Sequence, residues 1–126
     1  MTLEFPAGLP GFEDHTRFVL VERPDVAPIL FLQSVDSPEL CFITAPVTSI
    51  DPAYDLEMTP EDERQLGTDE AGEFLCLAIL SAAENGLLTA NLLAPVVINP
   101  GTCRGVQAVR SDSRYSHQHP LEARCS

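Results

Sequence analysis

The sequence of 126 residues contains no lysine and no tryptophan, and its seven cationic side chains are all arginine. Against these arginines stand 19 aspartate and glutamate residues, which give a formal net charge of −12. An acidic surface repels phosphate groups, so direct binding of nucleic acid is not expected. The charge favours a basic partner, or it serves solubility alone.

Long apolar segments are also absent. The longest uninterrupted apolar run, Phe74 to Leu80, has seven residues, whereas a helix needs about 20 to cross a membrane. The first six residues have neither the basic start nor the apolar stretch of a secretory signal. We therefore expect a cytoplasmic protein with no membrane partner.

The four cysteines are widely spaced and form no C-x-x-C pair. Without a secretory signal, disulfides are not expected. Cys41 and Cys76 lie within apolar runs and are predicted to be small core residues. Cys125, close to the C-terminal residue, is expected to be exposed.

No sequence motif for catalysis is found: G-x-S-x-G, the P-loop and G-x-G-x-x-G are all missing. His15 stands alone, and a metal site of His117 and His119 with Cys103 or Cys125 would need four converging ligands. We therefore expect no catalytic residue, no metal and no other cofactor. The alternative is a small β-barrel enzyme, or a ligand- or metal-binding protein, that uses these histidines with a carboxylate.

The charge is unevenly distributed along the chain. Residues 1–103 hold 17 acids and three arginines, a net −14, whereas residues 104–126 hold four arginines and two acids, a net +2. The acidic body is either a solvated surface or a surface that steers a basic partner toward it.

Short runs of β-branched and aromatic residues, separated by glycine and proline, are typical of strands. Asn85-Gly86 is the strongest hairpin signal, because both residues tolerate the positive φ of a type I′ turn. We expect an all-β fold, a small antiparallel β-barrel-like domain of about seven to nine short strands over residues 1–110. Residues 111–126 are expected to be a C-terminal tail that packs on the barrel or extends from it. The predicted strands lie near residues 18–21, 29–32, 40–44, 54–58, 73–81 (central, and buried on both faces), 87–93, 95–100 and 104–109.

One short surface helix is predicted near residues 59–66. Thr59 can cap its free N–H groups, Pro60 suits the first helical position, and Gly67 suits the end. Acids in the first turn favour the positive end of the helix dipole and can steer a basic partner. Replacing the acids Glu61, Asp62 and Glu63 with arginine should slow association with that partner.

Two stretches combine glycine, proline and asparagine in an unusual way. Residues 5–13 read F-P-A-G-L-P-G-F-E, in which Gly8-Leu9-Pro10-Gly11 is expected to form a sharp turn. Residues 91–99 read N-L-L-A-P-V-V-I-N, in which Pro95 interrupts a strand ladder and the asparagines can satisfy the freed backbone groups. The second stretch predicts a strand corner or an interaction edge.

Together these stretches resemble the F-P-x-G-L-P-G-F-E and N-L-x-A-P-hydrophobic-hydrophobic-I-N signatures of the FliW family of flagellar assembly factors. Phe31-Leu32-Gln33-Ser34, Tyr115 and His119-Pro120-Leu121 also fit, so the resemblance runs from about residue 3 to residue 121. It implies a small β-barrel-like cytoplasmic bacterial protein without catalytic activity. It also implies two partners bound in turn: flagellin, and the RNA-binding translational repressor CsrA, whose antagonism relieves repression of flagellin mRNA.

The resemblance supplies a basic partner for the acidic body. It favours a separate, allosteric surface over mimicry of RNA, and we hypothesise non-competitive antagonism of the repressor. The family usually carries another strand before the first signature, and without that strand the edge near Phe18–Val21 is expected to be open. Partner contacts are hypothesised at Phe12, Glu13, Asp14, Glu61, Asp62, Glu63, Asn91, Ala94, Pro95 and Asn99.

Overall fold

The computed structural model describes residues 1–67, 73–82, 84, 86–109 and 115–121. The elements found within these residues are, in chain order, β1 (Thr2–Glu4), β2 (Arg17–Glu22), the 3-10 helix η1 (Pro24–Val26), β3 (Leu30–Ser34), β4 (Cys41–Pro46), α1 (Val47–Ile50), α2 (Pro60–Leu66), β5 (Leu75–Ala82), β6 (Leu88–Ala90), β7 (Val96–Asn99), β8 (Arg104–Gln107) and β9 (His119–Pro120).

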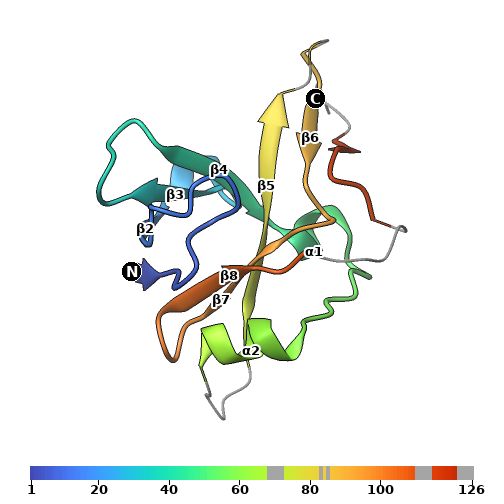
Figure 1. Cartoon of the computed structure of the whole chain (residues 1–126). Coiled ribbons are helices and arrows are strands. Elements are labelled where there is room, and N and C mark those ends of the chain that lie inside the picture. The colour runs from blue at the N-terminus through green and yellow to red at the C-terminus, as the bar shows by residue number, and fades with distance from the viewer. Residues whose placement is uncertain (68–72, 83, 85, 110–114, 122–126) are drawn as a thin grey trace.

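Seven strands close into a barrel in the order β1-β2-β3-β4-β5-β7-β8 (Figure 1). The pairing of β4 with β5 and of β8 with β1 completes the circle. All neighbours are antiparallel except β1 and β8, which run parallel and pair at Glu4 and Arg104. Strands β6 and β9 extend the sheet from the far end of β5, outside the barrel. The all-β, barrel-like fold expected from the sequence is confirmed.

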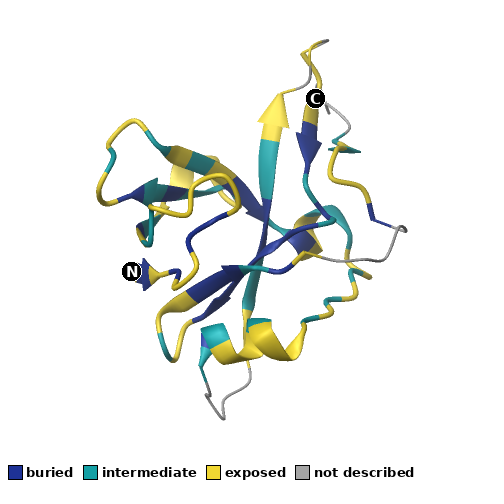
Figure 2. Ribbon diagram, viewed as in Figure 1, coloured by how far each residue is buried: buried dark blue, intermediate teal, exposed yellow. Residues whose placement is uncertain are grey.

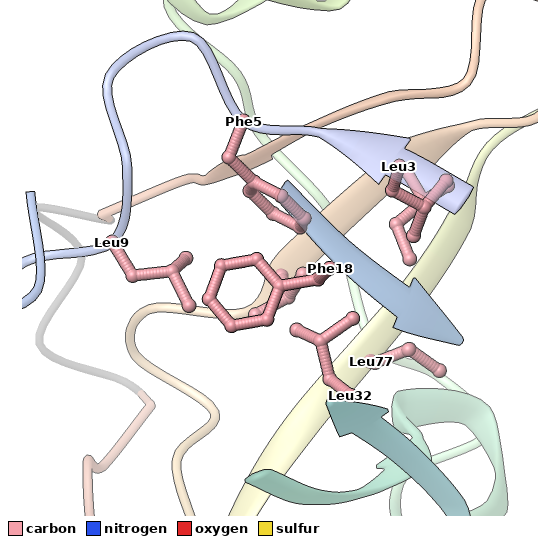
Figure 3. Close-up of a cluster of buried hydrophobic side chains, with 8 residues drawn as sticks. Leu3, Phe5, Leu9, Phe18, Leu32 and Leu77 are labelled. Carbon is pink, nitrogen blue, oxygen red and sulfur yellow. The ribbon is translucent and has the colours of Figure 1, made fainter. Parts of the chain in front are cut away.

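Side chains from most strands of the barrel fill its interior. Figure 3 shows Phe5, Phe18 and Leu32 meeting there, and the rings of Phe5 and Phe18 are edge to face with centroids 5.4 Å apart. Each of these three residues is fully buried. At about 25 cal/mol per Å² of apolar surface, this interior is a main stabilising term of the fold.

Two further clusters cover parts of the outer wall. One packs Leu92 and Tyr115 against β5, and the other packs Leu66 of α2 against β7 and β8. In Figure 2, β7 and the middle of β8 are dark blue, whereas much of α2 is yellow. The helix thus lies on the surface as predicted, anchored by the buried Leu66.

Residues 54–58 form no strand, contrary to the prediction. Their alternation is real, because Tyr54, Leu56 and Met58 pack against the outer clusters while Asp55 and Glu57 are exposed. The backbone, however, joins no ladder, and the N–H of Asp55 donates to the hydroxyl of Tyr115 at 3.0 Å. Alternation of apolar and polar residues indicates which side chains are buried, but it does not show that the segment pairs with another strand.

Strand β1 was not predicted, and it changes the expected strand edge. Thr2 pairs with Val19 and Leu3 with Phe18, and the N–H of Leu20 donates to the carbonyl of Met1 at 2.9 Å. The edge that was expected to be open is therefore paired as far as Leu20. The short helices η1 and α1 were not predicted either.

Two burial predictions need correction. Cys41 is exposed, because it lies on the outward side of β4, next to the inward-facing Phe42. Cys76 is half-buried against the outer clusters, in closer agreement with its predicted core position. Strand β5 is central in the sheet, but Leu77 and Ala78 are its only fully buried residues. Cys125 and Asn85 lie outside the described residues.

Candidate functional site

The first signature closes one end of the barrel. Phe5 and Leu9 are buried inside it, and the chain between them turns back on itself at Gly8, whose φ is +66°. A β-carbon at Gly8 would lie 2.6 Å from the backbone of Glu13. This close approach explains why glycine is needed there, and it confirms the predicted sharp turn.

Phe12, Glu13 and Asp14 follow this turn and are exposed. The Phe12 ring is 39% exposed and contacts the Phe42 ring edge to face, with centroids 5.5 Å apart. A carboxylate oxygen of Glu13 accepts the N–H of Gly11 at 3.0 Å, and this hydrogen bond lowers the pKa of Glu13 below its ordinary 4.5. The rigid turn therefore presents one aromatic ring and two carboxylates at this end of the barrel.

The second signature forms the corner between β6 and β7. The side-chain oxygen of Asn91 accepts the N–H groups of Leu93 and Ala94 at 3.1 and 3.0 Å. The carbonyl of Ala94 accepts the side-chain amide of Gln107 at 2.9 Å, and that of Pro95 accepts the backbone N–H of Ala108, the residue after β8, at 2.9 Å. The predicted strand corner is confirmed, and Ala94 and Pro95 are buried within it.

Asn99 is buried at the end of β7 and links three segments. Its side-chain amide donates to the carbonyls of Leu66 and Gly67 at 3.3 and 3.5 Å, and its oxygen accepts the N–H of Gly101 at 3.0 Å. Asn99 thus fixes the end of α2 to the β7–β8 hairpin. Both asparagines of the signature bind backbone groups of their own chain, as the sequence predicted.

The three acids of α2 differ in their surroundings. Asp62 and Thr59 form a capping box, with both hydrogen bonds at 3.1 Å. Glu61 pairs with Arg64 at 2.8 Å, and the hydrogen bond from this guanidinium lowers the pKa of Glu61 below 4.5. Glu63 is exposed and has no ion pair among the described residues.

Every arginine in residues 1–103 is engaged by a carboxylate of the same chain. Arg17 contacts Asp36 at 3.2 Å and Arg23 contacts Asp25 at 3.1 Å, in addition to the pair on α2 described above. These pairs are exposed, so each adds little to stability. Each pair neutralises one of the three arginines locally, within a stretch of sequence whose net charge is −14.

The structure separates the hypothesised contact residues into two groups. The residues of the second signature are buried or half-buried and form hydrogen bonds within the chain, whereas the others lie at the surface, on the turn after Gly8 and on α2. Sequence reasoning missed a third feature, a row of outward-facing apolar residues on β2, β3 and β4. Its signal in the sequence was that most alternate positions of these strands are apolar, Arg17 and Gln33 excepted.

The histidines do not assemble a catalytic group in the described part of the chain. The Nδ1 of His15 lies 3.3 Å from the hydroxyl of Ser34, but Ser34 is buried and its oxygen accepts the N–H of Ser37 at 3.1 Å. His119 borders an open hollow of about 310 Å³ beside Asp51. Among the described residues, no three His, Cys, Asp or Glu side chains gather as metal ligands.

The comparisons with known proteins agree with this architecture. The sequence model of the family described as FliW protein matches residues 1–121. This chain belongs to the FliW family of flagellar assembly factors. The first FliW signature therefore closes one end of the barrel, and the second forms the corner between β6 and β7.

Individual FliW relatives match over most of their length. The flagellar assembly factor FliW of Syntrophomonas wolfei is 35% identical over 93% of this chain and 76% of its own. That of Symbiobacterium thermophilum is 38% identical over 94% and 87%. A crystal structure of the flagellar assembly factor FliW is similar with a TM-score of 0.84, at 31% identity over 94% of this chain and 84% of that one.

Helices of the FliW barrel are short. None in the described residues is both long enough and apolar enough to cross a membrane.

Proposed function

We propose that this FliW-family protein is a non-enzymatic, cytoplasmic regulator that binds flagellin and, when flagellin is absent, binds and antagonises a CsrA-type repressor. Antagonism of the repressor would relieve its block on flagellin mRNA. Membership of the flagellar assembly factor family supports this role.

The observation that carries the proposal is the net charge of −14 on residues 1–103. These residues hold 17 acids, and each of their three arginines is already paired with a carboxylate of the same chain. A protein that binds RNA offers a basic surface, and opposite charges raise the rate at which the two proteins meet.

One group of acids lies on α2 and on the segment that precedes it. Asp55, Glu57, Glu61 and Glu63 are exposed, and the one base in residues 54–67 is Arg64, which pairs with Glu61. We call these four acids the acidic strip. The acidic strip is the region from which we expect long-range attraction of the repressor.

Binding should be measured by isothermal titration calorimetry with the repressor and the flagellin of the same organism. We expect each partner to bind one site with a Kd of about 1 µM or lower, or roughly −8 kcal/mol. Absence of heat with both folded partners would contradict the proposal.

The mode of antagonism needs a second titration, with RNA present. If the protein acts through a separate, allosteric surface, raising the RNA concentration to saturation should not restore the repressor–RNA complex. Antagonism that added RNA titrates away would instead support direct mimicry of RNA and would contradict the allosteric proposal.

A further inference from the structure

The outer wall of the barrel is covered on one side and bare on the other. Residues of β5, β7 and β8 that point outward are buried under Leu66, Leu92 and Tyr115. The outward residues of β2, β3 and β4 belong to none of the three buried clusters. They are largely apolar, with Arg17 and Gln33 as the polar exceptions, and we call the apolar ones the β2–β4 face: Val19, Val21, Phe31, Cys41 and Ile43.

The register aligns these side chains into rows. Val21 pairs with Phe31, and Phe31 pairs with Ile43, so the three lie side by side across three strands. Val21 is 37% exposed and Ile43 is 47% exposed. Because an outward strand position normally carries a polar residue, a contiguous apolar row of this kind marks an interaction site.

One acidic residue lies near each end of the β2–β4 face. Glu22 ends β2, next to the outward Val21, and borders a hollow that Leu20 and Leu30 also line; Glu39 lies in the loop that joins β3 to β4. Both are exposed, and neither has an ion pair among the described residues. The two arginines nearby, Arg17 and Arg23, are already paired with aspartates.

We propose that the β2–β4 face docks an amphipathic segment of a basic protein, with apolar side chains on the row and arginine or lysine beside Glu22 and Glu39. Charge complementarity selects this occupant, since a second copy of the chain would bring the same acids against them and a net charge of −12. The proposal rests on the proposed function in that the repressor is the basic partner expected in the cell.

The first test uses probes that are independent of the repressor. The isotope-labelled protein is titrated with a synthetic peptide that alternates valine and arginine, and with its counterpart that alternates valine and glutamate. We expect the arginine peptide alone to shift the amide signals of β2, β3 and β4 in the NMR spectrum. Shifts centred on α2, shifts caused equally by both peptides, or no shifts at all would overturn the proposal.

The second test uses variants of one face residue in repressor binding. Ile43→Arg removes the apolar contact and adds repulsion, whereas Ile43→Glu removes the same contact and keeps the favourable charge. We expect Ile43→Arg to weaken repressor binding about tenfold and Ile43→Glu about threefold. Val109 is 60% exposed and lies outside the face, so Val109→Arg and Val109→Glu are the matched controls and should bind as wild type.

The outcomes separate the surface from the function. If the arginine peptide binds the face but neither repressor nor flagellin binds the protein, the surface proposal stands and the proposed function fails. If the repressor binds wild type and all four variants equally, the function stands and the surface proposal is overturned. A loss of binding affinity that appears only with flagellin, or that is equal in both Ile43 variants, also overturns the proposal that the occupant is basic. Circular dichroism of each variant confirms that the barrel is intact.

Discussion

At Gly105, a β-carbon would lie 2.5 Å from the ring of Phe5 inside the barrel. This glycine has no positive φ, so its role is space and not backbone conformation. The residues of the two signatures likewise maintain the fold. Gly8 leaves room for the backbone of Glu13, and Asn91 and Asn99 form hydrogen bonds with backbone groups. The role of Asn91 could be predicted from the sequence, because the nearby proline frees groups that need partners. The link from Asn99 to the end of α2 could not, because it joins segments that are distant in the sequence.

Replacing Gly105 with alanine should destabilise the barrel. The added methyl group overpacks the interior against Phe5, at a cost of about 2–3 kcal/mol in the free energy of unfolding. Gly86→Ala is the control, because nothing lies within 4 Å of its β-carbon position and only its φ of +84° is strained. We expect that control to cost about 1 kcal/mol. Urea denaturation measures both, and equal costs would contradict the packing argument.

Glu13 should titrate below its ordinary pKa of 4.5, because its charged form accepts the N–H of Gly11. Since the folded-state pKa is lowered, the stabilising contribution of this hydrogen bond is present above pH 4.5 and is lost as the pH falls through the folded-state pKa. An NMR titration of the side-chain carboxyl carbon gives the pKa. A value at or above 4.5 in the folded protein would show that the hydrogen bond is absent in solution.

Among the elements, α2 was predicted correctly and the strand at residues 54–58 was not. The helix is encoded locally, by the cap at Thr59, the proline at the first position and Gly67 at the end. A strand requires a partner that the local sequence does not name, and at residues 54–58 the neighbouring strands already pair with one another. The three residues of β1 were too few to produce a recognisable pattern, and only tertiary pairing makes them a strand.

The capping box of α2 should be worth more than the charges around it. Asp62→Ala removes the acceptor for the N–H of Thr59 and should cost about 1 kcal/mol of unfolding free energy. Glu63→Ala, a change of the same kind one residue later, should cost less than about 0.5 kcal/mol because its side chain is exposed and outside the cap. Thermal unfolding compares the two variants, and a Glu63→Ala cost equal to that of Asp62→Ala would contradict the assignment.

On the scale of the whole molecule, the sequence predicted the barrel class and the sign of the charge. It did not predict which outer wall is covered, because that depends on where the segment at residues 54–66 and the described tail residues 115–121 pack. The bare β2–β4 face is therefore a tertiary property. The three arginines of residues 1–103 are paired with acids, and the acidic strip lies on α2 and on the segment before it.

Association with the repressor should depend on salt and on the acidic strip. Raising the ionic strength from about 0.05 to 0.3 M should slow association about tenfold, since screening shortens the reach of the charges. Glu63→Arg should slow association about threefold at low salt and weaken its salt dependence. Glu84→Arg makes the same charge change between β5 and β6. In Figure 1 the end of β5 that leads toward β6 lies opposite α2, so this variant should have the smaller effect. Stopped-flow fluorescence gives both rates, and equal effects would place the encounter surface elsewhere.

The most direct measurement of the proposed function follows the repressor–RNA complex itself. Labelled flagellin mRNA leader bound to the repressor is titrated with this protein, with and without flagellin, and fluorescence anisotropy reports the bound RNA. The account predicts that the protein releases the RNA and that an equimolar amount of flagellin prevents the release. RNA that stays bound at saturating protein, or a release that flagellin leaves unchanged, would contradict it.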